Sequence, residues 1–565
     1  MFNSKLNKLE IASNKKQTSV ETKKIGIVGN TNAFVSAAKQ VAAVTLSGNG
    51  ALKYSTTGND FVDQFGKMGS YKVERSYAEI ESDMSKLWAL NPLLAVSFIF
   101  FLRIITRVVQ LWAGNKTETV QRGAGLKHEA ITRMIWLHVN HQDTFWKNIQ
   151  LFIAVGSWRD IFEMLRYDLQ HNDWNNRVLD WNKFGTLLQA GLENPNTVNL
   201  VKKYMPQIKA RSKCTTIETQ ANTMIGKWLS SLLFGEKKYS LYRKMKSSGT
   251  AHQWQQLISK QLYDRLDFNT VHGRALSLMV SGKFITNHNL TSKYETWLAT
   301  KPVARFTGYV HELFKDNLNS LKQYQIDTIN KQFAGLVETA KKNAKTGTSL
   351  IIVRDTSGSM SSPATGTKQS AGDIAKALAL FFSEMLPSGH FANSWIEFDN
   401  NATMHTWQGS TPVEKWKNDR SKYIGSTNFQ SVISLFAFIK HTGVPESEFP
   451  TGILCISDGE FNPTDLGTTN VNRALNKLRD SGFSPEYIAN FQIILWNLRT
   501  YGYGNTAGNK FETYGNVPNV YYFSGYDGSI VAFLTGVDGQ TSVPKNAEEL
   551  FNAAMNQEVM SLIEI

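Results

Sequence analysis

The chain has 565 residues, of which 42% are hydrophobic and 19% charged, and it contains 61 Lys and Arg residues against 47 Asp and Glu residues. This length predicts two or more domains, and the composition is that of a globular protein rather than a disordered one. The two cysteines, Cys214 and Cys455, exclude a disulfide framework. They are expected to be small packing residues in a reducing, cytoplasmic compartment.

The charge is divided unevenly along the sequence. Residues 1–350 carry 47 basic and 26 acidic side chains, a net charge of +21, whereas residues 351–565 carry 14 and 21, a net charge of −7. A difference of this size predicts a polyanionic partner for the first part of the chain only. The alternative is that the positive charge of the first part only keeps the protein soluble.

The first segments of the chain predict neither a secretion signal nor a membrane span. Residues 1–45 are basic and polar, without an apolar core, and are expected to form a flexible arm. Residues 87–102, LWALNPLLAVSFIFFL, are more apolar, but these 16 residues include Asn91 and Pro92. A helix needs about 20 residues to cross a bilayer, and this stretch is shorter. We therefore expect a buried helix and no membrane partner.

Residues 46–345 are predicted to form an all-α domain. Large apolar residues recur three or four positions apart, which is typical of amphipathic helices, and strand-like alternation is nearly absent. The clearest helical segments are 55–66, 81–90, 125–141, 142–158, 159–170 and 182–194, and residues 318–347 read as a last helix and a Lys/Gly linker. Many short helices joined by polar turns indicate stacked helix pairs, either as an α-solenoid or as a ring of repeats.

Residues 346–565 alternate between apolar strands and amphipathic helices. Strands are expected at 349–355, 394–399, 402–407, 451–461, 490–498 and 519–525, and helices at 371–386, 428–441, 470–482 and 547–565. The second and third strands read as a hairpin across Asn400 and Asn401. Continuous apolar strands between helices predict a doubly wound, Rossmann-like α/β domain whose parallel sheet is covered on both faces.

Polar side chains follow the strands of this domain where a parallel sheet binds its ligands, at the carboxyl ends of the strands. Asp355, Ser357 and Ser359 follow the first strand, Asp458 follows the run ILCIS, and Thr427 lies in the loop that enters another helix. Oxygen ligands without His or Cys favour Mg²⁺ over zinc. Because hydroxyl ligands add no charge, the ion could bind a further carboxylate or phosphate.

The sequence DTSGS also has other interpretations. It lacks the flanking glycines of the G-x-S-x-G hydrolase elbow, and it lacks the lysine and spacing of a P-loop. Its oxygens could instead cap the following helix. A Mg²⁺-dependent phosphohydrolase or nuclease would need a second carboxylate cluster, for which Asp399 and Glu460 are the candidates, with Glu460 better placed to support a ligand. No set of nucleophile, base and orienting group is found, so we expect no enzyme.

The segments DTSGS (355–359), GSTN (425–428) and SDGE (457–460) resemble the metal-ion-dependent adhesion site of von Willebrand factor A domains. This resemblance implies a Mg²⁺ site with ligands from Asp355, Ser357, Ser359, Thr427 and Asp458, some of them through water. It further implies that an acidic group of a protein partner completes the octahedron.

The basic half is similar to the TROVE module of Ro autoantigen-type RNA-binding proteins, on residues 49–60 and 121–165, and the strand at 520–530 is like the end of an uncharacterised branch of that family. In this family a HEAT-like helical ring precedes the same A domain. The resemblance implies a ribonucleoprotein that holds non-coding or structured RNA. The alternative is a protein–protein interaction scaffold without RNA.

Three groups of residues are candidates for RNA contact. They are Arg122, Lys127, His128, Arg133, His138 and His141; then Lys202, Lys203, Lys209, Arg211 and Lys213; and finally Lys237, Lys238, Arg243, Lys244 and Lys246. Lys127 and His128 begin a predicted helix after a glycine loop, an arrangement that suits phosphate. Cations interleaved with Tyr239 and Tyr242 suit single-stranded RNA, although solvated helix faces are the alternative. Trp158 is expected to be a packing residue.

Overall fold

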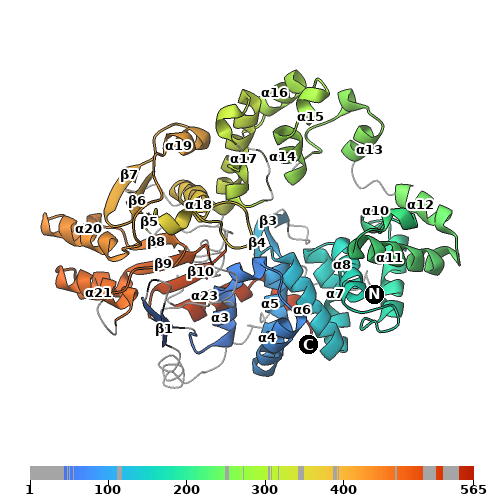
Figure 1. The fold of residues 1–565 in the computed structure, drawn as a ribbon, viewed down its shortest axis with the longest axis horizontal. Coiled ribbons are helices and arrows are strands. Elements are labelled where there is room, and N and C mark those ends of the chain that lie inside the picture. The colour runs from blue at the N-terminus through green and yellow to red at the C-terminus, as the bar shows by residue number, and fades with distance from the viewer. Residues whose placement is uncertain are drawn as a thin grey trace, which may run out of the picture.

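The fold is described from a computed structural model of the chain (Figure 1). The described residues are 44–46, 49, 51–54, 56–110, 118–248, 253–271, 273–302, 304, 306, 308–315, 317–341, 349–385, 391, 393–464, 468–499, 517–525 and 546–565. The predicted arm at 1–45 lies almost wholly outside these residues, and so does the predicted boundary between residues 345 and 346.

The first part of the chain is helical, as predicted. Its helices are α3 (Asp60–Gly66), α4 (Tyr77–Leu90), α5 (Pro92–Arg103), α6 (Lys127–Asn140), α7 (Gln142–Val155), α8 (Trp158–His171), α9 (Trp181–Glu193), α10 (Val198–Tyr204), α11 (Ile217–Phe234), α12 (Tyr239–Ser248), α13 (Gln253–Ser259), α14 (Arg274–Ser281), α15 (Phe284–Asn287), α16 (Thr291–Ala299) and α17 (Gln323–Lys341). The helices follow an arch that begins beside the sheet and returns to it (Figure 1). Many neighbouring helices pack against one another, such as α5 with α6 and α16 with α17.

Two short antiparallel strand pairs, which the sequence did not predict, lie before α3 and between α5 and α6. They are β1 (Val44–Leu46) with β2 (Leu52–Tyr54), and β3 (Ile105–Gln110) with β4 (Glu118–Ala124). The β3 segment ITRVVQ is rich in β-branched residues, which favour strands. β1 and β2 have three residues each, too few for an alternation to stand out, and β3 and β4 do not alternate strictly between apolar and polar residues.

The apolar stretch at 87–102 divides between two helices because of Asn91 and Pro92. The Asn91 side chain accepts a hydrogen bond from the backbone N–H of Leu94 (3.0 Å), and Pro92 occupies the first turn of α5, where its missing N–H costs nothing. From Leu94 onward α5 is buried on all sides, as expected. No helix among the described residues is long and apolar enough to cross a membrane.

The second part of the chain is a six-stranded sheet with the order β10–β9–β8–β5–β6–β7. Its strands are β5 (Leu350–Asp355), β6 (Ser394–Phe398), β7 (Ala402–Thr406), β8 (Gly452–Ser457), β9 (Gln492–Asn497) and β10 (Val520–Ser524). Neighbouring strands are parallel except β7, which pairs antiparallel with β6 as the predicted hairpin. Chain order reverses at β5 and β8, which makes the carboxyl edge between them the switch point of a doubly wound sheet.

Helices cover both faces of the sheet, which confirms the predicted fold class. Helix α18 (Ala371–Met385) packs on one face against residues such as Leu454 and Ile494. Helices α20 (Gln430–His441) and α21 (Asn470–Asp480) pack on the other face, against Ile453 and Ile493. The remaining helices are α19 (Pro412–Asn418), α22 (Pro485–Asn490) and α23 (Ala547–Met555).

The two ends of the helical arch contact one another, so the helical region closes into a ring. The Lys72 ammonium, in the 3₁₀ helix Met68–Lys72, donates a hydrogen bond to the Tyr309 hydroxyl and lies 3.8 Å from the centre of that ring. A loop of the sheet domain joins this contact, since Gln369 Nε2 donates to the His311 carbonyl (3.3 Å). Gly366, with φ +73°, lies where a Cβ would come within 2.7 Å of Lys72 Cβ.

One hydrophobic cluster joins the helical region to one face of the sheet domain. The Phe551 ring of α23 lies 5.6 Å from the rings of Phe61 and Phe65 in α3 and 6.1 Å from that of Phe98 in α5, centre to centre. Phe65 also meets Phe523 of β10 (6.5 Å). Helices from the two ends of the described chain therefore interlock, and the same core continues under α18.

Ser524 at the end of β10 makes the polar part of this joint. Its buried hydroxyl donates to the Gly66 carbonyl (2.6 Å) and accepts from the Gly69 N–H (2.8 Å). Ser524→Ala should lower the free energy of unfolding by about 2 kcal/mol, because both backbone groups lose their partner in a dry site. Chemical denaturation measures this loss. Ser434→Ala, at an exposed position of α20, is the control and should change stability little; equal losses in both variants would contradict the prediction.

Candidate metal-binding edge and basic surface

The five residues predicted as metal ligands follow strands or loops at one edge of the sheet. Asp355 ends β5 and Asp458 follows β8, and the register that pairs Arg354 with Ile456 brings these two strand ends side by side. Both carboxylates are buried. Ser457 Oγ donates to Asp355 Oδ2 (2.5 Å), so the residue before Asp458 is hydrogen-bonded to Asp355.

The hydroxyl residues belong to loops that backbone hydrogen bonds tie together. Ser357 and Ser359 lie in the turn after β5, with 3.1 Å between their Oγ atoms. The loop that carries Thr427 is joined to this turn through Gly358 N–H to Gly425 O (3.3 Å), and the Thr427 carbonyl accepts from the Asn462 N–H (2.9 Å) of the loop after β8. Three loops thus form one connected edge.

The residues of this edge fit a hard divalent cation by the chemistry of their donors. Two carboxylates and three hydroxyls offer oxygen alone, which suits Mg²⁺. The described residues contain no group of three or more His, Cys, Asp or Glu side chains that could hold a metal, and this edge differs from such groups in using hydroxyls. Asp399 Oδ1 accepts from the Asn401 N–H (3.1 Å).

The residues of DTSGS stabilise a local turn and do not cap helix α18, which was the alternative interpretation. Asp355 Oδ1 accepts from the Ser357 N–H (2.8 Å), which fixes the turn directly after β5. Helix α18 receives its cap from Ser370, whose Oγ accepts from the Asp373 N–H (3.0 Å). The hydroxyls of Ser357 and Ser359 are therefore not needed to begin α18.

Charge is concentrated and poorly solvated at this edge. Burial, together with the negative charge of Asp458, raises the pKa of Asp355 to about 7. Asp458 Oδ2 lies 3.3 Å from Nη1 of Arg499, a residue that follows β9. A bound cation would stabilise both carboxylates in their charged form.

Asp355→Asn should stabilise the metal-free protein at pH 8 by about 2 kcal/mol. The pKa of Asp355 is raised in the folded state, so its contribution to stability is present below about pH 4 and is lost as the pH rises through about 7. Urea denaturation in EDTA at several pH values measures the difference, which should grow between these limits. A difference between the two proteins that does not change with pH would contradict the assignment.

A buried ion pair that the sequence analysis missed supports the Thr427 loop. Arg354, one residue before Asp355, points to the other face of the sheet, where its Nη1 lies 2.7 Å from Asp419 Oδ2. Its guanidinium stacks 3.9 Å from the centre of the Trp395 ring. Asp419 also meets Lys376 (3.4 Å) and accepts from Ser421, so it anchors the segment that leads to Thr427.

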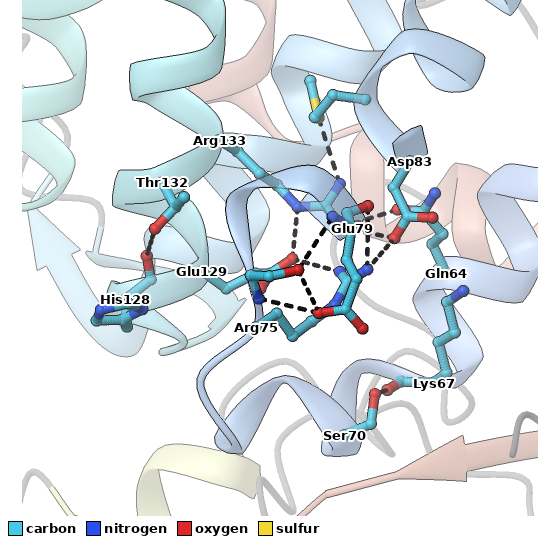
Figure 2. A network of polar contacts seen from close by, with 12 residues as sticks. Gln64, Lys67, Ser70, Arg75, Glu79, Asp83, His128, Glu129, Thr132 and Arg133 are labelled. Carbon is cyan, nitrogen blue, oxygen red and sulfur yellow. Dashed lines mark hydrogen bonds and ion pairs between the residues drawn. The ribbon is translucent and has the colours of Figure 1, made fainter. Parts of the chain in front are cut away.

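The first group of predicted RNA contacts is largely inside the protein, which corrects the prediction for three of its members. Figure 2 shows Arg133 in a buried network, where its Nε donates to Glu129 (2.9 Å) and its Nη2 to Gln64 (2.9 Å). Arg75 binds the same Glu129 and also Asp83. The fully buried Arg133 stabilises the packing of α3, α4 and α6 and has no surface from which to meet a phosphate.

Arg122 and His138 are corrected for the same reason. Arg122 is 1% exposed, and its backbone exchanges hydrogen bonds with the Gln557 side chain. His138 packs among Phe145, Trp146 and Phe184, and burial lowers its pKa to about 4, so it is neutral at pH 7. Both residues were predicted to be exposed because basic side chains are usually solvated.

The other members of the first group lie nearer the surface, and each contacts another side chain of the protein. Lys127 begins α6 as predicted and pairs with Glu163 (2.9 Å), while His128 Nε2 lies 3.2 Å from Glu74. His141 stacks on Trp88 with 3.7 Å between ring centres. Trp158 is buried against Gly191, as expected of a packing residue.

The second and third groups, separate in sequence, form one surface. Helix α12 packs on the segment after α10: the Tyr242 hydroxyl donates to the Pro206 carbonyl (2.8 Å), Arg243 to Ile208 O (3.5 Å), and Lys246 to Met205 O. The α10–α12 surface comprises Lys202, Lys203, Lys209, Lys213, Lys237, Lys238, Arg243, Lys244 and Lys246. The side chain of Arg211 lies outside the described part. Residues 194–248 contain eleven Lys and Arg residues and two acidic residues.

Together these features define a protein class: a closed helical ring with a basic surface, joined to a doubly wound α/β domain with an oxygen-rich carboxyl edge. A family model described as a domain of unknown function (DUF7788) matches residues 349–561. The chain is similar to the crystal structure of Deinococcus radiodurans Ro (RSR) protein, with 12% sequence identity and a TM-score of 0.30, over 88% of this chain and 93% of that chain. A comparison with curated proteins found no match.

Proposed function

We propose that the chain is a non-catalytic RNA-binding protein, the protein part of a ribonucleoprotein, which holds RNA on the α10–α12 surface. The observation that carries this proposal is the merger of two basic groups into one surface with a strong excess of positive charge. Lys209, Lys213, Lys238 and Lys244 are exposed there. Lysines spaced over neighbouring helices can neutralise successive phosphates and release their counterions, which is the main source of affinity for a polyanion.

Salt dependence tests the RNA proposal. Binding of fluorescent single-stranded and hairpin RNA, measured by anisotropy, should weaken linearly on a log–log plot between about 50 and 200 mM salt, with a slope of about 0.7–0.9 for each phosphate contact. Binding of either RNA that does not change with salt would contradict the proposal. If neither RNA binds, the helical ring is better explained as a protein-binding scaffold.

We further propose that the carboxyl edge binds Mg²⁺ through Asp355, Ser357, Ser359, Thr427 and Asp458 and presents it to an acidic protein partner. The support is the connected geometry of three loops and a donor set of hard oxygens. The chain's own residues hold the ion and leave a position for one more carboxylate, because the hydroxyls are neutral. Asp355→Ala should abolish Mg²⁺ binding, measured by titration calorimetry, and leave RNA affinity nearly unchanged.

The competing enzymatic function has a direct test. A Mg²⁺-dependent nuclease or phosphohydrolase would cleave the bound RNA or release phosphate from a phosphomonoester when Mg²⁺ is added. We expect neither product, since the Asp399 carboxylate accepts a hydrogen bond within its own turn and, among the described residues, no nucleophile paired with a base lies at this edge. Cleavage that disappears in Asp355→Ala would overturn the non-catalytic assignment.

A further inference from the structure

Arg499 places a positive charge against one carboxylate of the candidate metal site. It follows β9, and its backbone N–H donates to Asn497 Oδ1 (2.7 Å), which fixes the start of its loop. Its side chain is 12% exposed, and its Nη1 lies 3.3 Å from Oδ2 of the fully buried Asp458 side chain.

The contact between Arg499 and Asp458 is longer than that of the buried Arg354–Asp419 pair in the same domain. Arg354 and Asp419 approach to 2.7 Å, which is within the usual range for charge-assisted hydrogen bonds, whereas Arg499 and Asp458 are 3.3 Å apart. At 3.3 Å, Arg499 Nη1 still donates a long hydrogen bond to Asp458, and the positive charge of the guanidinium lies against the carboxylate. This charge lowers the repulsion between two carboxylates that end neighbouring strands and have little water around them.

A divalent cation that binds both Asp355 and Asp458 must act against Arg499. If the guanidinium stays in place, it repels the ion across a poorly solvated site. If it moves away, the ion pair with Asp458 is lost. In both cases the free energy of metal binding is less favourable than it would be with a neutral side chain at position 499.

We propose that Arg499 is an internal cation that competes with the metal ion for Asp458 and sets the affinity of the edge for Mg²⁺. This inference rests on the proposed metal site. Arg499 stabilises the metal-free fold and keeps the site from being loaded at low metal concentration. Because binding couplings are reciprocal, the metal weakens the Arg499–Asp458 contact by the same factor by which Arg499 weakens metal binding.

Replacing Arg499 with a neutral residue tests this competition. Arg499→Met in the full chain should bind Mg²⁺ at least about 10-fold more tightly than the wild type by titration calorimetry. In EDTA its melting temperature should be lower, and its shift on adding Mg²⁺ should be larger. Arg499→Lys keeps the charge and should stay within about threefold of the wild-type affinity. Arg479→Met, at an exposed position of α21, is the matched control and should not change Mg²⁺ affinity.

The outcomes separate this inference from the metal site itself. Equal or weaker Mg²⁺ binding by Arg499→Met would overturn the competition, and weaker binding would identify Arg499 as a residue that positions Asp458. Absence of Mg²⁺ binding in the wild type and in every variant would overturn the metal site as well. If Arg499→Met does not fold, Arg499→Gln, which removes the charge but keeps a hydrogen-bond donor, must show the same tighter binding.

Discussion

Asp419→Asn should lower the free energy of unfolding by about 3–5 kcal/mol, because it leaves the fully buried guanidinium of Arg354 without its counter-charge. Arg354 occupies a central strand, where water cannot replace the lost partner. Its stacking on Trp395 cannot compensate, since a cation–π contact is worth about 1–2 kcal/mol. Denaturant unfolding followed by circular dichroism measures the loss.

Two variants sharpen this test. Asp480→Asn, an exposed acid at the end of α21, makes the same chemical change without a buried partner and should alter stability by less than about 0.5 kcal/mol. Arg354→Met combined with Asp419→Asn removes both charges and should be more stable than Asp419→Asn alone. A double variant that is less stable than the single variant would show that the pair acts through something other than charge.

The same pair should make stability depend on acid. Burial opposes the ionisation of Asp419, but the charge and hydrogen bond of Arg354, with Lys376 nearby, outweigh it and hold the pKa of Asp419 well below its usual range. Its folded pKa is lowered, so its contribution to stability is present above about pH 4 and is lost as the pH falls below that value. Asp419→Asn should remove this part of the acid sensitivity.

Neutralising four lysines of the α10–α12 surface should weaken RNA binding about 100-fold at about 0.15 M salt, if each contacts one phosphate. The variant is K209Q/K213Q/K238Q/K244Q, and all four side chains are exposed. The slope of log affinity against log salt should also fall by about 3. Fluorescence anisotropy over a salt series measures both quantities in one experiment.

A variant with the same change in net charge is the control for the lysine prediction. K86Q/K260Q/K322Q/K422Q removes four exposed lysines that lie outside the α10–α12 surface. It should lose less than about threefold in affinity, because screening limits distant charges to roughly one Debye length, near 8 Å at physiological ionic strength. Equal losses in the two variants would show that net charge, not this surface, binds the RNA.

The sheet domain and its edge were predictable because their signals are local. Each strand is a continuous apolar run, and in a parallel sheet the residues that follow such runs must meet at one edge. Asp355 and Asp458 could therefore be placed without knowing any side-chain contact. The contact between the Thr427 loop and the Ser357 turn could not be predicted, because it depends on backbone hydrogen bonds, which any residue type can make.

Other features could not be predicted because their partners are far away in the sequence. Arg354 binds Asp419, 65 residues later, so nothing near the strand marks it as half of an ion pair. Arg133 has its partner Glu129 one turn away, but its burial comes from α3 and α4, which only the tertiary structure brings over it. Closure of the ring at Lys72 and Tyr309 is equally non-local.

The interlocking of α3 and α5 with α23 has a consequence for synthesis on the ribosome. Phe98 emerges about 450 residues before Phe551, the ring that completes its packing. Because synthesis adds about 5–20 residues per second, the apolar faces of α3 and α5 stay without this partner for roughly 20–90 s. The nascent chain therefore carries an exposed aromatic surface throughout this interval, and holding chaperones should associate with it until α23 has left the ribosome.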